Sequence, residues 1–134
     1  METHKLKIIN KQYERHDITL QLSRKGWDCC MTAESSVTGK VNFSGYDYFK
    51  CLTKLRLLLE SKGYLILCLG ATKNITLSRM CSESTAGLKA YQIELGKEAL
   101  IENLIDVLEP IQNGAVTVEE QENFRKQWLQ TFKI

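Results

Sequence analysis

The chain has 134 residues, 43% hydrophobic and 25% charged, which predicts one globular domain over residues 1–134. Its formal charge of +2 is too small a bias to indicate a nucleic acid or an anionic membrane as its partner. The N-terminal residues lack the apolar core of a signal peptide, and no apolar run approaches the roughly 18 residues that a membrane helix needs.

The first 45 residues predict strands. Leu6 and Ile8 lie two apart and suggest a first strand at the edge of a sheet. The next stretch, "DITLQLS", alternates strictly, as a half-buried strand does, with its apolar residues at Ile18, Leu20 and Leu22. The glycine-containing turn "RKG" then leads into "WDCCMTA", so the two segments predict a hairpin. Residues 34–45 look irregular, with at most a short strand at 41–43.

A helix and a buried strand follow. Ser44 is the candidate N-cap, with Asp47 as a weak capping-box partner, and Gly63 stands where a helix of this length ends. The apolar stripe has spacings of four, three and four: Tyr48, Leu52, Leu55 and Leu59. The run "YLILCLG" is nearly all apolar, which predicts a central strand covered on both faces.

Residues 72–87, "TKNITLSRMCSESTAG", are mostly small and polar and predict a long surface loop. A connection of that length in a compact domain is usually functional or disordered. The next segment, "LKAYQIEL", predicts a strand whose shared face carries Tyr91, Ile93 and Leu95. Residues 97–110 fit either a helical turn before a short strand at 104–108 or one helix that ends at Pro110.

The last predicted element is a helix that begins at a capping box formed by Thr117 and Glu120. Its apolar stripe repeats every four residues: Phe124, Trp128 and Phe132. Taken together, the elements predict an α+β fold. We expect a mostly antiparallel or mixed sheet of about five to six strands, with two main helices on one face.

Groups that could perform catalysis are scarce. His4 and His16 have no cysteine or carboxylate at metal-ligand spacing. Cys29 and Cys30 are adjacent on a predicted strand, so their side chains point to opposite faces. Phosphate loops, dinucleotide fingerprints and nucleophile elbows are also lacking. We therefore expect no catalytic residue, metal or cofactor, and five free thiols in a cytoplasmic protein.

Charge is unevenly distributed. Residues 94–122 hold eight acidic residues and one basic residue, a net charge of −7. One interpretation is a solvated face together with acids that suit the N-terminus of the last helix. The other is an acidic docking surface, since a cluster of one sign steers the approach of an oppositely charged partner.

Four stretches carry a resemblance to a known family: "LRLLLESKGYLILCLGATKNITLSRM", "GLKAYQIELGK", "LIDVLEP" and "TVEEQENFRKQWLQTF". Their order, over roughly residues 55–132, resembles small bacterial immunity proteins encoded beside polymorphic toxins, including those of contact-dependent growth inhibition systems. The shared elements are "KGY…LC.GA.K" at 62–73, Ser78 with Met80, and "G.KAY…LG" at 87–96. The stretch after Met80, "CSESTAG", departs from the glycine-rich sequence expected there.

The resemblance implies a cytoplasmic, non-enzymatic protein, a monomer or weak dimer with no membrane and no direct nucleic-acid contact. Its partner would be a cognate toxin C-terminal domain, probably a nuclease, whose active site or substrate path it covers. The candidate toxin-binding residues are those of the long segment and the acidic stretch: Arg79, Met80, Glu98, Glu102, Asp106 and Glu109. For Met80 and Leu77, an alternative is that both tuck into the core and merely pin the loop.

Two other functions are open at this point. The first is a small-ligand-binding module or small enzyme that uses a pocket beside the 72–86 loop. The second is nucleic-acid binding through a weak basic and aromatic patch around Trp27: Lys5, Lys7, Lys11, Arg24 and Lys25. A tryptophan in a hairpin is more often part of the core, so we expect Trp27 to be buried.

Overall fold

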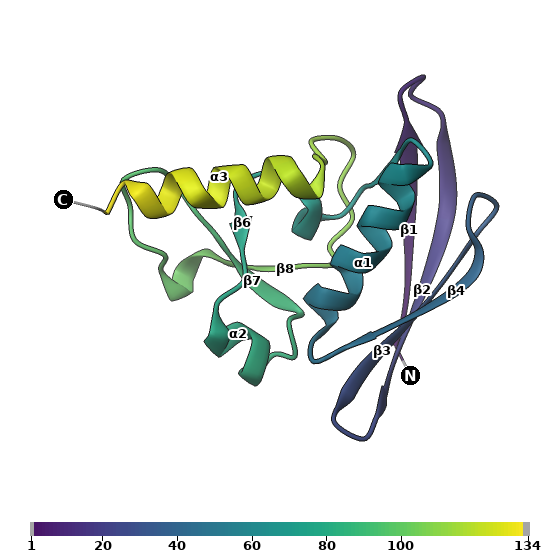
Figure 1. The fold of residues 1–134 in the computed structure, drawn as a ribbon, viewed down its shortest axis with the longest axis horizontal. Helices are drawn as coiled ribbons and strands as arrows, with labels where there is room; N and C mark the ends of the chain where they lie inside the picture. The colour runs from purple at the N-terminus through teal and green to yellow at the C-terminus, as the bar shows by residue number, and fades with distance from the viewer. Residues whose placement is uncertain (1, 133–134) are drawn as a thin grey trace.

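The computed structural model describes residues 2–132, which form an α+β fold with all strand pairs antiparallel (Figure 1). The predicted class and antiparallel pairing are confirmed. The strands are divided between two sheets: a five-stranded sheet in the order β4-β3-β2-β1-β5 and a three-stranded sheet in the order β6-β7-β8. None of the described helices is long and apolar enough to cross a membrane.

The larger sheet contains the predicted hairpin. Its strands are β1 (Glu2–Asn10), β2 (Arg15–Lys25), β3 (Asp28–Ser35), β4 (Gly39–Gly45) and β5 (Tyr64–Ile66). The alternating residues of β2, Ile18, Leu20 and Leu22, are buried as predicted. The stretch expected to be irregular is mostly strand, because β4 pairs with β3 along its whole length.

Helix α1 (Tyr48–Ser61) packs on the inner face of the larger sheet through the predicted stripe, and all four residues of that stripe are buried. Its N-cap is Asp47 rather than Ser44, since Ser44 still belongs to β4 and pairs with Cys30. The Asp47 carboxylate accepts a 2.7 Å hydrogen bond from the Lys50 backbone N–H. Gly63 ends the helix with φ of +84°, as predicted.

Two strand positions were predicted wrongly. β1 lies between β2 and β5, so it is not an edge strand, whereas the apolar run after α1 supplies β5 at the edge. β5 is only three residues long, and Leu67 to Gly70 then cross to the smaller sheet. Leu67 N–H donates to Lys7 O, and Gly70 N–H donates to Val107 O, each at 2.8 Å. The run is therefore apolar because it crosses the junction of the two sheets.

The smaller sheet contains β6 (Ile75–Thr76), β7 (Lys89–Gln92) and β8 (Leu104–Asp106). The expectation of a structureless loop at 72–87 is wrong, because this segment holds β6 and the short helix α2 (Arg79–Ser84). A 3₁₀ turn, Ile101–Asn103, precedes β8, which decides the ambiguity at 97–110 in favour of a helical turn and a short strand.

Helix α3 (Val118–Gln130) begins at the predicted capping box of Thr117 and Glu120. It is fastened to α1 by a buried polar contact, in which Arg56 Nη1 donates to Gln121 Oε1 at 2.7 Å. A second, smaller core lies between α3, α2 and the smaller sheet, and we call it the satellite core. Its buried members are Cys81, Tyr91 and Ile93, and the side chains packed on them include Leu77, Ala99, Leu104, Phe124 and Trp128.

Candidate docking surface

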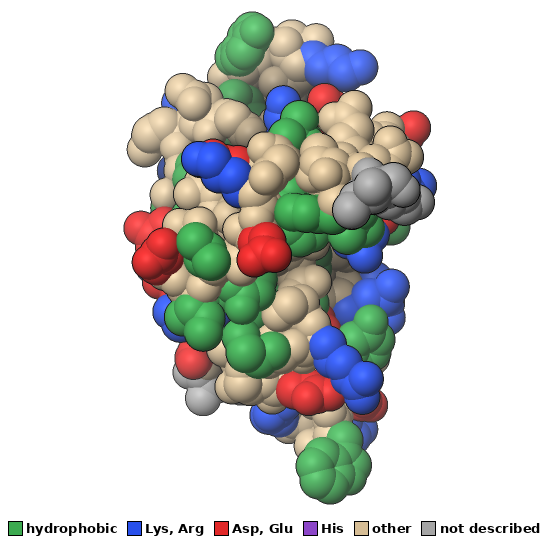
Figure 2. Space-filling model, turned by 90° about the vertical axis from the view of Figure 1, so that its left-hand side faces the viewer, with side chains coloured by type: hydrophobic (Ala, Val, Ile, Leu, Met, Phe, Trp, Pro, Cys, Tyr) green, Lys and Arg blue, Asp and Glu red, His purple; other side chains and the backbone are tan. Residues whose placement is uncertain are grey.

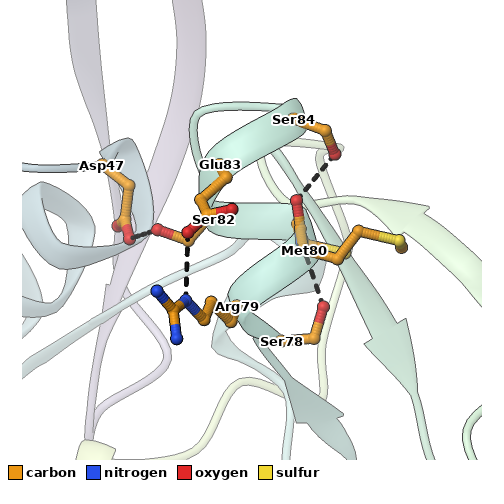
Figure 3. A network of polar contacts seen from close by, with 8 residues as sticks. Asp47, Ser78, Arg79, Met80, Ser82, Glu83 and Ser84 are labelled. Carbon is orange, nitrogen blue, oxygen red and sulfur yellow. Dashed lines mark hydrogen bonds and ion pairs between the residues drawn. The ribbon is translucent and has the colours of Figure 1, made fainter.

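Helix α2 is a short surface helix held in place by polar contacts (Figure 3). Ser78 caps it by accepting a 3.0 Å hydrogen bond from the Cys81 N–H, and Cys81 itself is buried in the satellite core. On the other side, Ser82 Oγ donates to Asp47 Oδ2 at 2.6 Å. Because α2 is tied both to the satellite core and to the N-terminus of α1, it presents its outer side chains on a rigid base.

The outer side of α2 carries both predicted contact residues. The Arg79 side chain is 92% exposed and pairs with Glu83 across one helical turn, with Nε to Oε1 at 3.0 Å. Met80 is 46% exposed, and it leaves the helix on a different side from Arg79 (Figure 3). Leu77, in contrast, packs against both cores. Leu77 therefore pins the segment, while Met80 is available for an intermolecular contact.

Beside α2, the segment from 94 to 103 exposes apolar side chains that sequence patterns did not identify. Leu95, predicted to share the buried face of Tyr91 and Ile93, is half exposed, as is Leu100, and Ile101 is 71% exposed. Together with the partly exposed Phe132 at the end of α3, they form what we call the end patch. Figure 2 shows hydrophobic side chains gathered on this end of the molecule with acidic side chains beside them.

Two hydrogen bonds fix the segment that carries the end patch against α3. Trp128 Nε1 donates to Lys97 O at 2.8 Å, and Gly96 N–H donates to Thr131 Oγ1 at 3.1 Å. The Phe132 ring meets the Trp128 ring edge-on, with centroids 5.2 Å apart. Although the segment has almost no regular secondary structure, its backbone is held in place. Exposed apolar residues on such a base are typical of interaction sites.

The predicted acidic residues fall into separate groups. Glu98 and Glu102 are exposed and belong to the same segment as the end patch. Asp106 lies at the end of β8, where its carboxylate pairs with Lys89 Nζ at 2.9 Å. Glu109 lies beyond β8, beside a hollow that Glu2 of β1 also lines. Two of the segments that carry predicted residues, α2 through Cys81 and residues 94–103 through Ala99, thus pack on the same satellite core, whereas Asp106 and Glu109 lie at and beyond the end of β8.

The acids of α3 have local structural roles. Glu120 closes the capping box, and Glu122 pairs with Arg125, with Oε1 to Nη1 at 3.0 Å. Both interactions suit the first turns of a helix, where negative charge faces the positive end of the macrodipole. Several acids of the stretch from 94 to 122 are therefore engaged in local ion pairs or in a helix cap.

A cleft of about 720 Å³ lies away from α2, between the β1–β2 turn, β5 and residues 113–117. Two carboxylates line it, but Glu60 accepts the Val118 N–H at 3.0 Å and Glu120 belongs to the capping box. The hollow beside the 72–86 segment is much smaller, about 130 Å³. A second hollow, of about 520 Å³, lies just past the end of that segment and is lined by Leu88 and Tyr48 among others.

Most of the thiols are buried and poorly placed to react. All five cysteines are free, and four of them are buried. Burial raises the pKa of Cys51 to about 11 and that of Cys68 to about 12, so both stay protonated at neutral pH. Within residues 2–132, no group of three His, Cys, Asp or Glu side chains could hold a metal ion.

Trp27 is the largest departure from expectation in the N-terminal half. It is 96% exposed, so the prediction that it belongs to the core is wrong. It occupies the two-residue turn between β2 and β3 with Gly26, whose φ is +63°. The turn could have predicted this exposure from the sequence. A side chain at the tip of a two-residue hairpin extends beyond the sheet that could cover it.

No protein-family model matches this sequence, and no curated protein matches it at a significant level. In structural terms the described residues define a two-sheet α+β domain with a rigid apolar and acidic surface at one end.

Proposed function

We propose that this protein is an immunity protein, which binds a cognate toxin domain and neutralises it by covering the active site or substrate path. The observation that carries the proposal is the end patch beside α2. Its exposed apolar side chains share one segment with the exposed Glu98 and Glu102, and that segment packs on the satellite core through Ala99. An apolar centre with a polar rim is the usual composition of a protein–protein interface. The family resemblance over residues 55–132 supports the same function.

The chemistry of this surface suits a basic partner. Met80 and Ile101 supply apolar area, while Glu98 and Glu102 supply negative charge that accelerates encounter with a positive surface. The substrate path of a nuclease is positively charged, because it binds the phosphate backbone. A nuclease toxin is therefore the partner that best fits the acidic rim. The proposed action is binding alone, with no chemical step, and it takes place in the cytoplasm.

The decisive experiment is co-expression with the toxin domain encoded beside this gene. Cells should survive the toxin only when this protein is present, and the two proteins should co-purify at a fixed ratio. Survival without co-purification would instead indicate an enzyme that repairs or modifies the toxin's target.

The surface is tested with point variants of the complex. Met80→Ala and Ile101→Ala should each speed dissociation by about tenfold, which corresponds to the 1.4 kcal/mol typical of a well-packed contact. Glu98→Lys with Glu102→Lys should slow association at low salt. Leu57→Ala is the matched control, since Leu57 is an exposed apolar residue on α1. If both apolar variants bind like this control, the toxin binds a different surface.

A further inference from the structure

The turn between β2 and β3 displays an aromatic side chain that the fold does not use. Trp27 is 96% exposed, so its indole contributes almost no buried area to folding. Gly26 alone supplies the positive φ that the turn requires, and a polar residue at position 27 would serve the turn as well. Tryptophan at this position therefore has no explanation in the stability of the domain.

A second exposed aromatic residue adjoins the turn. Tyr46 follows Gly45, which pairs with Cys29 at the start of β3, so Tyr46 lies beside the base of the turn. It is 70% exposed, and its neighbour Asp47 is buried as the cap of α1. The backbones that carry both aromatic residues are thus fixed, one by the β2–β3 ladder and the other by the start of α1. Rigid aromatic side chains lose little entropy on binding.

The charge around the two aromatic residues is positive. Arg24 and Lys25 end β2, and Lys50 and Lys54 lie on the first turns of α1. The nearby acids are Asp28, the buried cap Asp47, and Glu2, which lines a hollow with Arg24. Lys50 carbons lie within about 3.3 Å of where a Cβ on Gly45 would stand, and Lys54 Nζ donates to Ser44 O at 2.7 Å. Both lysines therefore lie next to the end of β4 that leads into Tyr46. This charge is opposite to that of the rim of the end patch.

We infer that Trp27 and Tyr46 are a second contact for the proposed toxin partner, inserting into an apolar pocket of the toxin domain that is bordered by carboxylates. The inference rests on the proposed function. Tryptophan, tyrosine and arginine are the residue types that dominate binding energy at protein interfaces, and Arg24 completes that set. Figure 1 shows both the β2–β3 turn and α2 on the lower side of the view, the turn at the tip of the larger sheet and α2 beside the smaller sheet, so a partner that contacts both would cover this side.

The shape of the turn favours a protein over a nucleic acid. Figure 1 shows the turn as a projecting tip, whereas single strands bind in a basic groove that follows their backbone. A projecting tip suits a pocket on the partner. With an acidic rim at the end patch and a basic rim at the turn, the two contacts also fix one orientation of the partner.

The experiment uses tryptophan emission of the full chain titrated with the co-expressed toxin domain. Wild type is compared with Trp27→Phe, which keeps Trp128 as its sole tryptophan, so the difference between them isolates Trp27. Burial of Trp27 in the complex should shift its emission to the blue and protect it from acrylamide. Trp27→Ala should weaken binding at least tenfold with an unchanged melting temperature, and Trp27→Phe should recover part of the loss.

The other possible results of this experiment each contradict the inference. If the complex forms while Trp27 emission and quenching are unchanged, and Trp27→Ala binds within twofold of wild type, this inference is overturned and the proposed function stands. If this protein and the toxin domain form no complex, both this inference and the proposed function are overturned. Saturable quenching of Trp27 by a single-stranded oligonucleotide, or a self-association that Trp27→Ala abolishes, would assign the tip to a nucleic acid or to a second copy and would overturn the toxin contact.

Discussion

Ser82 of α2 and Asp47 of α1 are 35 positions apart in the chain, yet Ser82 Oγ donates a 2.6 Å hydrogen bond to Asp47 Oδ2 (Figure 3). The other carboxylate oxygen, Oδ1, caps α1 through the Lys50 N–H. A nearby backbone bond from Tyr48 N–H to Ala86 O, 2.7 Å long, closes the same junction. One buried carboxylate thus fixes both the start of α1 and the position of α2, which carries Arg79 and Met80.

Replacing Asp47 by alanine should therefore destabilise the protein more than loss of a cap alone. We expect a loss of about 1–3 kcal/mol, from the cap and from the unpaired Ser82 hydroxyl. Asp47→Asn keeps an acceptor for the Lys50 N–H and should lose less, and Ser82→Ala should lose about 0.5–1.5 kcal/mol. Urea unfolding of these variants and of the double variant gives the coupling. Equal losses for the alanine and asparagine variants would contradict the double role of the carboxylate.

Gly87 and Gly96 form a matched pair for testing the close approach of the α2 segment to α1. Both have positive φ, +77° and +79°. A Cβ at Gly87 would lie 2.8 Å from the Phe49 backbone N, whereas a Cβ at Gly96 would meet nothing within 4 Å. Gly96→Ala should cost about 1 kcal/mol from backbone strain. Gly87→Ala should cost clearly more in urea unfolding, and similar values for the two variants would show that the segment shifts freely.

The buried link between α1 and α3 gives a third prediction. Arg56 is 2% exposed and donates to Gln121 Oε1 and to Val116 O, at 2.7 and 2.8 Å. Arg56→Met leaves both acceptors without this donor and should cost about 2–4 kcal/mol. Adding Gln121→Leu removes one of the two acceptors that Arg56→Met leaves unpaired. It also removes the hydrogen bonds that the Gln121 amide donates to the carbonyls of Gly70 and Thr72. The double variant should therefore not recover wild-type stability in thermal unfolding; full recovery would show that the link is dispensable.

Stability should fall at alkaline pH because two thiols that are buried in the folded state ionise more readily in the unfolded state. Burial raises the folded-state pKa of Cys51 to about 11 and of Cys68 to about 12, against an ordinary value of 9.0. The folded state thus holds these protons more tightly than the unfolded state, so their contribution is complete below pH 9 and is lost as pH rises toward 11 or 12. Urea midpoints at pH 8 and pH 10.5 measure the loss. Cys51→Ala should reduce the difference between the two midpoints, while Cys30→Ala, at a half-buried site, is the control.

Thiol labelling supplies a separate measurement of the same burial. Cys30 is the half-buried cysteine, and the other four are buried. At neutral pH one thiol should therefore react rapidly with a disulfide reagent in the native protein, and all five should react in denaturant. Cys30→Ser should remove the rapid phase. A rapid phase that persists in Cys30→Ser would show that another thiol becomes accessible by local opening.

The sequence by itself determined the elements whose signals are local. The strict alternation of Ile18, Leu20 and Leu22 and the four-residue stripe of α1 each fix one face of an element, because the side-chain period of a strand or helix decides which residues share a face. The capping box of Thr117 and Glu120 likewise lies within four residues, and it marks the start of α3 correctly.

Only the tertiary structure decided where those elements lie and which side chains remain outside. The run "YLILCLG" is apolar in either a central strand or a junction, and only strand pairing shows that it forms the edge strand β5 and then crosses between sheets. Leu95 and Trp27 were expected to be buried from the sequence, yet they are 51% and 96% exposed. Burial depends on which distant segments arrive at a residue, as Ser82 arrives at Asp47, and that information is not contained in any short stretch of the chain.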